Sequence, residues 1–152
     1  VHIDDFAGLE SPAGWWNGVI KAVFEPVAAG AGDVTFTPAS WGPGHHPGPI
    51  SIPVTPIMVL EGVSSSRSEF DAYIGFRFFV DTPMDVCLAR GIERDMVLGK
   101  NREDVVHMWR EWLDEEIEFM ERDDPRSKAD CIVDGTRSFG AQIDELERAT
   151  RR

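Results

Sequence analysis

Acidic side chains directly follow two apolar segments of this chain, where they could bind a divalent cation or accept a proton. Asp4 and Asp5 come after residues 1–3, and Glu61 comes after residues 57–60. Carboxylates at neighbouring strand ends suit Mg²⁺, which prefers carboxylates, water and substrate phosphates as ligands. Asp4 could also accept the proton of an attacking hydroxyl group. The pair Asp4 and Glu61 therefore indicates phosphoryl transfer, a reaction that depends on positioning and charge neutralisation.

The few basic residues of this acidic chain include a cluster that could bind phosphates. Arg90 and Arg94 are four residues apart, on one face of a predicted helix, and Lys100 and Arg102 flank the break that follows it. Together these four residues could form a cationic lid. The alternative is that each arginine forms an ordinary ion pair, for example Arg94 with Asp95. We favour the ion pair for any single arginine and the lid for the cluster.

Composition excludes several classes of partner. The chain has 152 residues and a formal net charge of -12, which argues against nucleic acid and anionic membranes as partners. Its hydrophobic fraction of 42% predicts one globular domain over residues 1–152. Cys87 and Cys131 lie in apolar segments and predict buried thiols in a reducing compartment. Neither a membrane-spanning apolar run nor a signal-peptide pattern is present, so we expect a cytoplasmic protein.

Short apolar segments alternate with segments of helical periodicity. A first helix should begin near Ser11, be broken or kinked by Pro26 and end at Gly30. A long irregular loop is expected over 38–56, where Pro and Gly are frequent. Further strands are predicted over 57–60, 76–80 and 131–133, and further helices over 84–94, from Asn101 onward and over 140–148. This alternation predicts an α/β fold with a parallel sheet, whose ligands bind at the carboxyl ends of the strands. The acids at those ends are Asp4, Asp5, Glu61, Asp81 and Asp134.

The predicted helix that begins after Asn101 is long and amphipathic. Asn101 can cap it, with Asp104 three residues later. Four of its acids are expected on a solvated face and not at a metal site: Asp114, Glu115, Glu118 and Glu121. Its predicted apolar stripe consists of Val106, Trp109, Leu113, Ile117 and Met120.

In their order and spacing, these segments resemble the uridine kinase and phosphoribulokinase group of P-loop kinases, and most closely bacterial uridine-kinase-like proteins. The similar segments extend over nearly the whole chain: 2–6, 24–30, 59–63, 79–83, 88–95 and 129–135. The resemblance implies a three-layer α/β fold of the P-loop NTPase kinase type, with the parallel strands in the order 2-3-1-4-5. It also implies ATP and Mg²⁺ as cofactors.

The resemblance implies a role for individual residues. Asp4 matches the acid that activates the acceptor hydroxyl and helps to hold Mg²⁺, and Glu61 matches the second metal-site acid. Residues 95–103 match a lid over the ATP phosphates, and 38–56 a loop on the acceptor side. The remaining matches are lid and phosphate residues Arg90, Arg94, Lys100 and Arg102, adenine-side residues Gly135 and Thr136, and acceptor-binding residues Asp5, Phe6, Trp41 and Arg67.

Two features depart from the family. Residues 39–41 read Ala-Ser-Trp where many relatives have Tyr-Asp-Trp, which puts uridine itself in doubt as the acceptor. No G-x-x-x-x-G-K-[ST] phosphate loop occurs among these residues, and neither does the central first strand that would precede it. Without that strand two strand pairs would keep unpaired edges, which is costly. We therefore expect the biological polypeptide to carry an N-terminal strand, loop and helix as well.

The expected function is that of an ATP-dependent small-molecule kinase, which transfers the γ-phosphoryl group to a hydroxyl of a nucleoside or similar acceptor. One alternative is a non-catalytic nucleotide- or partner-binding relative that has no phosphate loop. The other is a kinase of the same fold with a different acceptor, such as a sugar or a vitamin precursor. A homo-oligomer is compatible with either enzyme.

Overall fold

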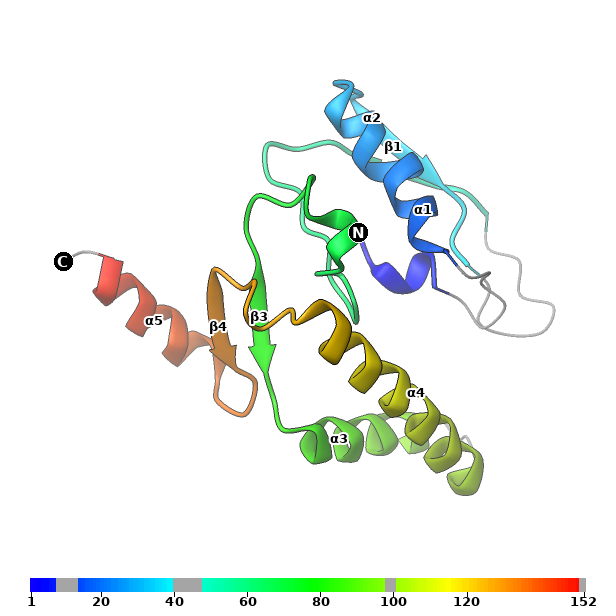
Figure 1. The fold of residues 1–152 in the computed structure, drawn as a ribbon, viewed down its shortest axis with the longest axis vertical. Coiled ribbons are helices and arrows are strands. Elements are labelled where there is room, and N and C mark those ends of the chain that lie inside the picture. The colour runs from blue at the N-terminus through cyan, green and yellow to red at the C-terminus, as the bar shows by residue number, and fades with distance from the viewer. Residues whose placement is uncertain (8–13, 40–47, 98–100, 151–152) are drawn as a thin grey trace. The chain divides into compact units, whose positions relative to one another are not determined.

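The computed structural model describes residues 1–7, 14–39, 48–97 and 101–150. It combines helices with two small sheets, one antiparallel and one parallel, so the predicted α/β class is confirmed at this level (Figure 1). The chain divides into two compact units, residues 1–74 and residues 75–152. A single domain over residues 1–152 stays a prediction. Within the described ranges, no helix is both long enough and apolar enough to cross a membrane.

The first unit contains a helical run that passes through Pro26. The run consists of α1 (Trp16–Val19), a wider π-helical segment η2 (Ile20–Phe24) and α2 (Glu25–Ala28). The run is therefore not broken at Pro26, and the alternative of a kink there stays a prediction. Pro26 lies in the first turn of α2, immediately after the wider turns of η2, and there its missing N–H group is tolerated. The predicted end at Gly30 is confirmed, because Gly30 has a φ of +80° and its N–H donates to the Val27 carbonyl at 3.0 Å.

A β-hairpin follows the helical run. Strand β1 (Asp33–Phe36) pairs antiparallel with β2 (Ile50–Pro53), with Val34 opposite Ile52. The prediction of an irregular loop over 38–56 is thus wrong at residues 50–53, while 40–47 lie outside the described residues. The frequent prolines concealed a short strand that ends at Pro53, a position where the lack of an N–H group does little harm.

Only a single bridge replaces the strand predicted over 57–60. The bridge is parallel and joins His2 to Glu61, with the Glu61 N–H donating to the Val1 carbonyl at 3.0 Å and the Ile3 N–H donating to the Glu61 carbonyl at 2.8 Å. Ile57 and Val59 are 81% and 64% exposed. Their apolar character predicted a buried strand, but burial also requires neighbouring elements to cover it.

The core of the first unit lies between the helical run and the segments at either end of the unit. Two short 3₁₀ turns border it, η1 (Ile3–Asp5) and η3 (Ser68–Phe70). Partly buried aromatic side chains, including Phe6 and Phe24, pack around the buried residues. The buried members are Ile3, Val19, Val23, Phe36 and Phe70.

The second unit contains a parallel strand pair. β3 (Phe78–Asp81) and β4 (Cys131–Asp134) pair in register, from Phe78 opposite Cys131 to Asp81 opposite Asp134. The predicted strands at these places are confirmed, with shifted bounds. Helix α5 (Phe139–Thr150) lies next to β4 (Figure 1). On β3, Phe78 and Val80 are 61% and 60% exposed. Phe76, just before the strand, is 56% exposed.

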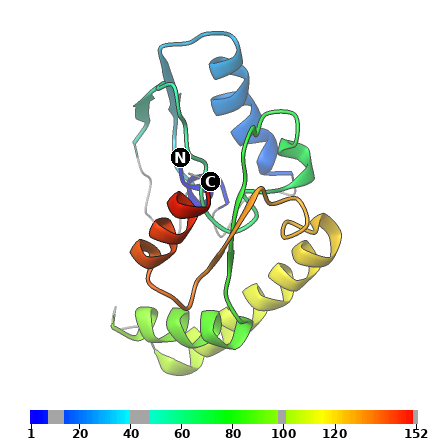
Figure 2. The same cartoon turned by 90° about the vertical axis from the view of Figure 1, so that its left-hand side faces the viewer.

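Helices α3 (Met84–Val97) and α4 (Arg102–Asp123) lie side by side (Figures 1 and 2). α4 begins as predicted, because the Asn101 side chain accepts hydrogen bonds from the N–H groups of Glu103 and Asp104 at 2.8 and 3.4 Å. α3 continues to Val97, beyond the predicted end at residue 94.

The buried stripe of α4 differs from the predicted one. Val105, Phe119 and Asp123 are its buried residues, whereas Ile117 is exposed. Glu116 is half-buried, and burial raises the pKa of its carboxyl group. An apolar pattern could not reveal a stripe that contains two acids. The predicted solvated face is confirmed, since the acids assigned to it are exposed: Asp114, Glu115, Glu118 and Glu121.

Candidate functional site

The parallel pairing in the second unit brings two of the predicted strand-end acids together. Asp81 and Asp134 are the last residues of β3 and β4 and lie opposite each other in the register. The Gly135 N–H donates to the Asp81 carbonyl at 2.8 Å, which closes the edge of the sheet directly beyond the two strands. The Asp81 carboxylate binds the Arg126 guanidinium at 3.1 Å.

The single bridge in the first unit places Asp4 and Glu61 on adjoining segments. His2 pairs with Glu61, and Asp4 follows two residues later in η1. Both acids are exposed. The Glu61 carboxylate contacts Nδ1 of His2, a partner that the sequence did not suggest.

The donor set of Asp4 and Glu61 is compatible with Mg²⁺. In the described part of the chain, no group of three or more His, Cys, Asp and Glu side chains is arranged to hold a metal. Mg²⁺ usually needs only one or two carboxylates, because water and substrate phosphates supply its other ligands. Two exposed carboxylates on adjoining segments fit that requirement, with His2 as a competitor for Glu61.

Two of the predicted acceptor-binding residues pack within the first unit. The Phe6 ring lies on Phe36, with centroids 4.6 Å apart and the planes tilted by 35°. Asp5 accepts a hydrogen bond from the Ala39 N–H at its carbonyl, at 2.6 Å. Both residues thus make contacts that stabilise the first unit next to Asp4. Trp41 lies outside the described residues.

Arg67, the other predicted acceptor-binding residue, is buried against aromatic rings. Its guanidinium lies 4.1 Å from the ring centroid of Trp16 and 5.3 Å from that of Trp15. Its Nη2 donates to Oε1 of Glu69 at 3.4 Å, and its Nε lies 3.3 Å from Oε2, an ion-pair contact that lacks hydrogen-bond geometry. Desolvation strengthens a cation–π contact. Arg67 therefore contributes to the packing of the first unit whatever else it binds.

Two arginines predicted to bind phosphates, Arg90 and Arg94, have partners within the second unit. Arg90 Nη1 donates to the Gly135 carbonyl at 2.9 Å. Arg94 Nε donates to Oδ1 of Asp95 at 3.1 Å, and the Arg94 guanidinium lies 5.4 Å from the Trp109 ring centroid. The alternative of an Arg94–Asp95 pair is confirmed, although Asp95 is buried and not on the surface.

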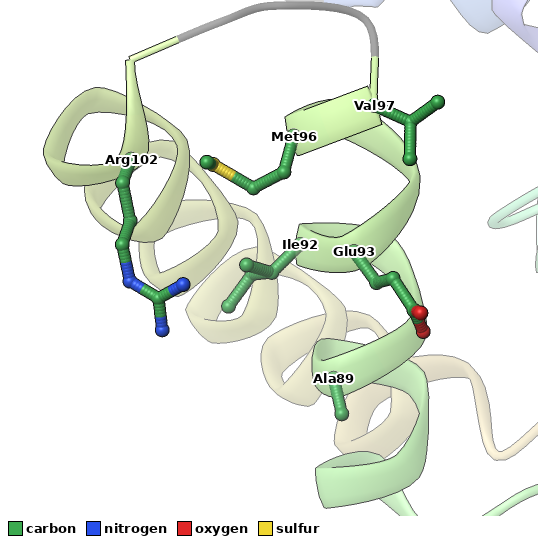
Figure 3. Close-up of a pocket in the computed structure, with 6 residues that line it drawn as sticks. All are labelled: Ala89, Ile92, Glu93, Met96, Val97 and Arg102. Carbon is green, nitrogen blue, oxygen red and sulfur yellow. The ribbon is translucent and has the colours of Figure 1, made fainter.

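Lys100 lies outside the described residues, so the lid over 95–103 is described only at its ends. Residues 95–97 form the last part of α3, and Arg102 is the first residue of α4. Arg102 lines an open cleft of about 530 Å³ with Glu93 and apolar residues of α3. Ile92 and Met96 project from α3 on the side of Arg102, as Figure 3 shows. The cleft thus joins one cation of the predicted lid to an apolar helix face.

The predicted adenine-side residues form a compact loop directly after β4. The Asp134 carboxylate accepts hydrogen bonds from the hydroxyl and the N–H of Thr136, at 2.6 and 2.8 Å. The hydroxyl donor, with the N–H second, stabilises the charged form and holds the pKa of Asp134 below its usual value. A Cβ atom on Gly135 would overlap Oγ1 of Thr82 and lie 2.9 Å from Cγ1 of Val80. The loop therefore needs glycine at this position.

Replacing Thr136 with valine should raise the pKa of Asp134 toward its usual value near 3.8, because the hydroxyl donor is lost. In the wild-type protein the lowered pKa stabilises the fold above about pH 4, and this contribution is lost as the pH falls through the native pKa. The valine variant should lose less stability in that range. A ¹³C NMR titration of the Asp134 carboxyl carbon measures the shift. Thr35→Val, which removes an exposed hydroxyl from β1, is the control, and identical Asp134 midpoints in T136V and wild type would contradict the assignment.

Sequence reasoning missed two residues that shape these places. Gln142 of α5 is buried and binds the backbone of Asp134. His2 contacts Glu61. His2 is adjacent to an apolar segment that ends in an acid, which is a weak signal. No local signal marks Gln142, because its partner lies in another element.

The two units together define an α/β protein with acids at the carboxyl ends of parallel pairings. No protein-family model matches this chain, and a search of the curated proteins finds no match.

Proposed function

We propose that this chain forms the acceptor, metal and lid parts of an ATP-dependent small-molecule kinase of the uridine-kinase-like type. The observation that supports it best is the pairing of the strands. In the sheet order 2-3-1-4-5, strand two pairs with strand three and strand four with strand five. The bridge from His2 to Glu61 corresponds to the first pairing, and β3 with β4 to the second.

The exposed apolar side chains support the same sheet order. In the part of the chain that the structure describes, β3 pairs only with β4, on one side, and its Phe78 and Val80 are exposed. A further parallel strand at the free edge of β3, with a helix over it, would cover such side chains. The kinase proposal requires that strand, with a phosphate-binding loop after it, from a segment other than these 152 residues.

In the proposed reaction, the hydroxyl oxygen of the acceptor attacks the γ-phosphorus of ATP, the bond to the bridging oxygen breaks and ADP leaves. Asp4 accepts the hydroxyl proton. Asp4 and Glu61 would hold Mg²⁺, which neutralises charge on the phosphates. Arg102 and Lys100 supply positive charge from the lid, while Arg90 and Arg94 have partners of their own in the free protein.

Two alternatives remain as competing proposals. The first is a non-catalytic nucleotide- or partner-binding relative, which the lack of a G-x-x-x-x-G-K-[ST] run in these residues favours. The second is a kinase of the same fold with a different acceptor, which the Ala-Ser-Trp sequence at residues 39–41 favours.

The test is an ADP-release assay on the polypeptide as its gene encodes it, with Mg²⁺, ATP and a panel of nucleosides, sugars and vitamin-like alcohols. The proposal predicts Mg²⁺-dependent ADP release with a nucleoside and far less without an acceptor. Release with only a sugar or another alcohol would support the second alternative. Nucleotide binding without release for any acceptor would support the first. Binding of neither ATP nor an acceptor would contradict a kinase.

A further inference from the structure

The Gln142 side chain forms hydrogen bonds with the backbone at the end of β4, as a neighbouring strand would do. Its Oε1 accepts a hydrogen bond from the Asp134 N–H at 2.7 Å, and its Nε2 donates to the Asp134 carbonyl at 2.8 Å. The side-chain amide thus satisfies both backbone groups of one residue. Because Gln142 is buried, removing it would leave these groups without a partner in a place that water reaches poorly.

The loop formed by Asp134, Gly135 and Thr136 is held at each of its residues. Arg90 binds the Gly135 carbonyl, and the Gly135 N–H binds the Asp81 carbonyl. The Asp134 carboxylate binds Thr136. Gln142 therefore completes a set of contacts that hold this loop from α3, β3 and α5.

We propose that Gln142 is a positioning residue, which prearranges this loop to receive the base of a bound purine nucleotide. The inference rests on the proposed kinase function, in which Gly135 and Thr136 lie on the adenine side. It goes beyond that function because Gln142 would affect binding of the base indirectly, by fixing the loop, and would not itself touch the nucleotide. A loop that is already ordered loses little conformational entropy on binding, which increases affinity.

The experiment compares the wild-type polypeptide, as its gene encodes it, with Gln142→Leu. Leucine has a similar size but cannot form either hydrogen bond. We expect the dissociation constant for ATP to rise roughly tenfold, as ordering the loop becomes part of binding. The dissociation constant for inorganic tripolyphosphate should stay unchanged, because that probe has no base. Amide hydrogen exchange at residues 134–136 should be faster in the variant without any nucleotide.

The controls separate this inference from the proposed function. Ala141→Gln changes an exposed neighbour on α5 and should leave both dissociation constants and the exchange rates as in wild type. If Q142L binds ATP as tightly as wild type, or weakens ATP and tripolyphosphate equally, the inference is overturned and the kinase proposal stands. Unchanged exchange at residues 134–136 also overturns it. A wild-type protein that binds no ATP overturns the proposed function, and the inference with it.

Discussion

Replacing Asp4 with asparagine is expected to lower the turnover number for phosphoryl transfer by about 10²–10⁴-fold, the usual contribution of a general base. Asparagine has nearly the same shape as aspartate but cannot accept the proton of the acceptor hydroxyl. Because Asp4 is exposed in η1, the substitution should leave folding intact. The measurement is the kcat of ADP release at saturating ATP and acceptor, with Mg²⁺ present.

The matched control is Asp33→Asn, which makes the same chemical change at an exposed position of β1. Its kcat should equal that of the wild-type protein, and thermal melting should show both variants folded. A D4N variant that turns over within twofold of wild type would rule out Asp4 as the base, even if the protein proves to be a kinase.

Replacing Gly91 with alanine is expected to destabilise the second unit by about 1–3 kcal/mol, the usual cost of overpacking a core. A Cβ atom there would overlap the indole of Trp109 and lie 2.6 Å from its Cε2. The indole cannot move away easily, because its Nε1 donates to the buried Asp95 at 3.1 Å. Alanine also gains up to about 1 kcal/mol of helix propensity over glycine, but the overlap outweighs this gain.

Urea unfolding followed by circular dichroism measures the free energy of unfolding of G91A. Gly140→Ala, in α5, is the control, because a Cβ atom there meets no heavy atom within 4 Å. That variant should be as stable as wild type or slightly more stable. The cost of G91A should shrink in a Trp109→Phe background, where the ring is smaller. A G91A variant at least as stable as wild type would contradict the packing of α3 on α4.

Local patterns in the sequence predicted the second unit well. The apolar segments before Asp81 and Asp134 became β3 and β4, and the helical periodicity before residue 94 became α3. The Asn101 cap was predictable because a cap depends on residues within one turn of the helix. The helix α3 and the Asn101 cap depend on residues that are close in sequence, whereas β3 and β4 became regular strands because they also pair with each other.

Features that depend on distant partners were not predictable in the same way. The strand predicted over 57–60 is reduced to a single bridge, since an apolar segment becomes a regular strand only where another strand pairs with it. The hairpin strand β2 arose within a segment rich in proline because β1 offered it a partner. The buried residues of α4 include Asp123, which an apolar pattern did not predict, because burial depends on the elements that cover the helix.

The candidate site likewise combines features that depend on local sequence with features that depend on distant partners. The sequence by itself determined which acids end apolar segments, Asp4, Glu61, Asp81 and Asp134, because strand length and the change from apolar to polar residues are local properties. Only the tertiary structure decided that Asp81 lies opposite Asp134 and that Gln142 binds the loop after β4. Register and hydrogen bonds between elements are chosen among many partners of similar chemistry, and packing in three dimensions makes that choice.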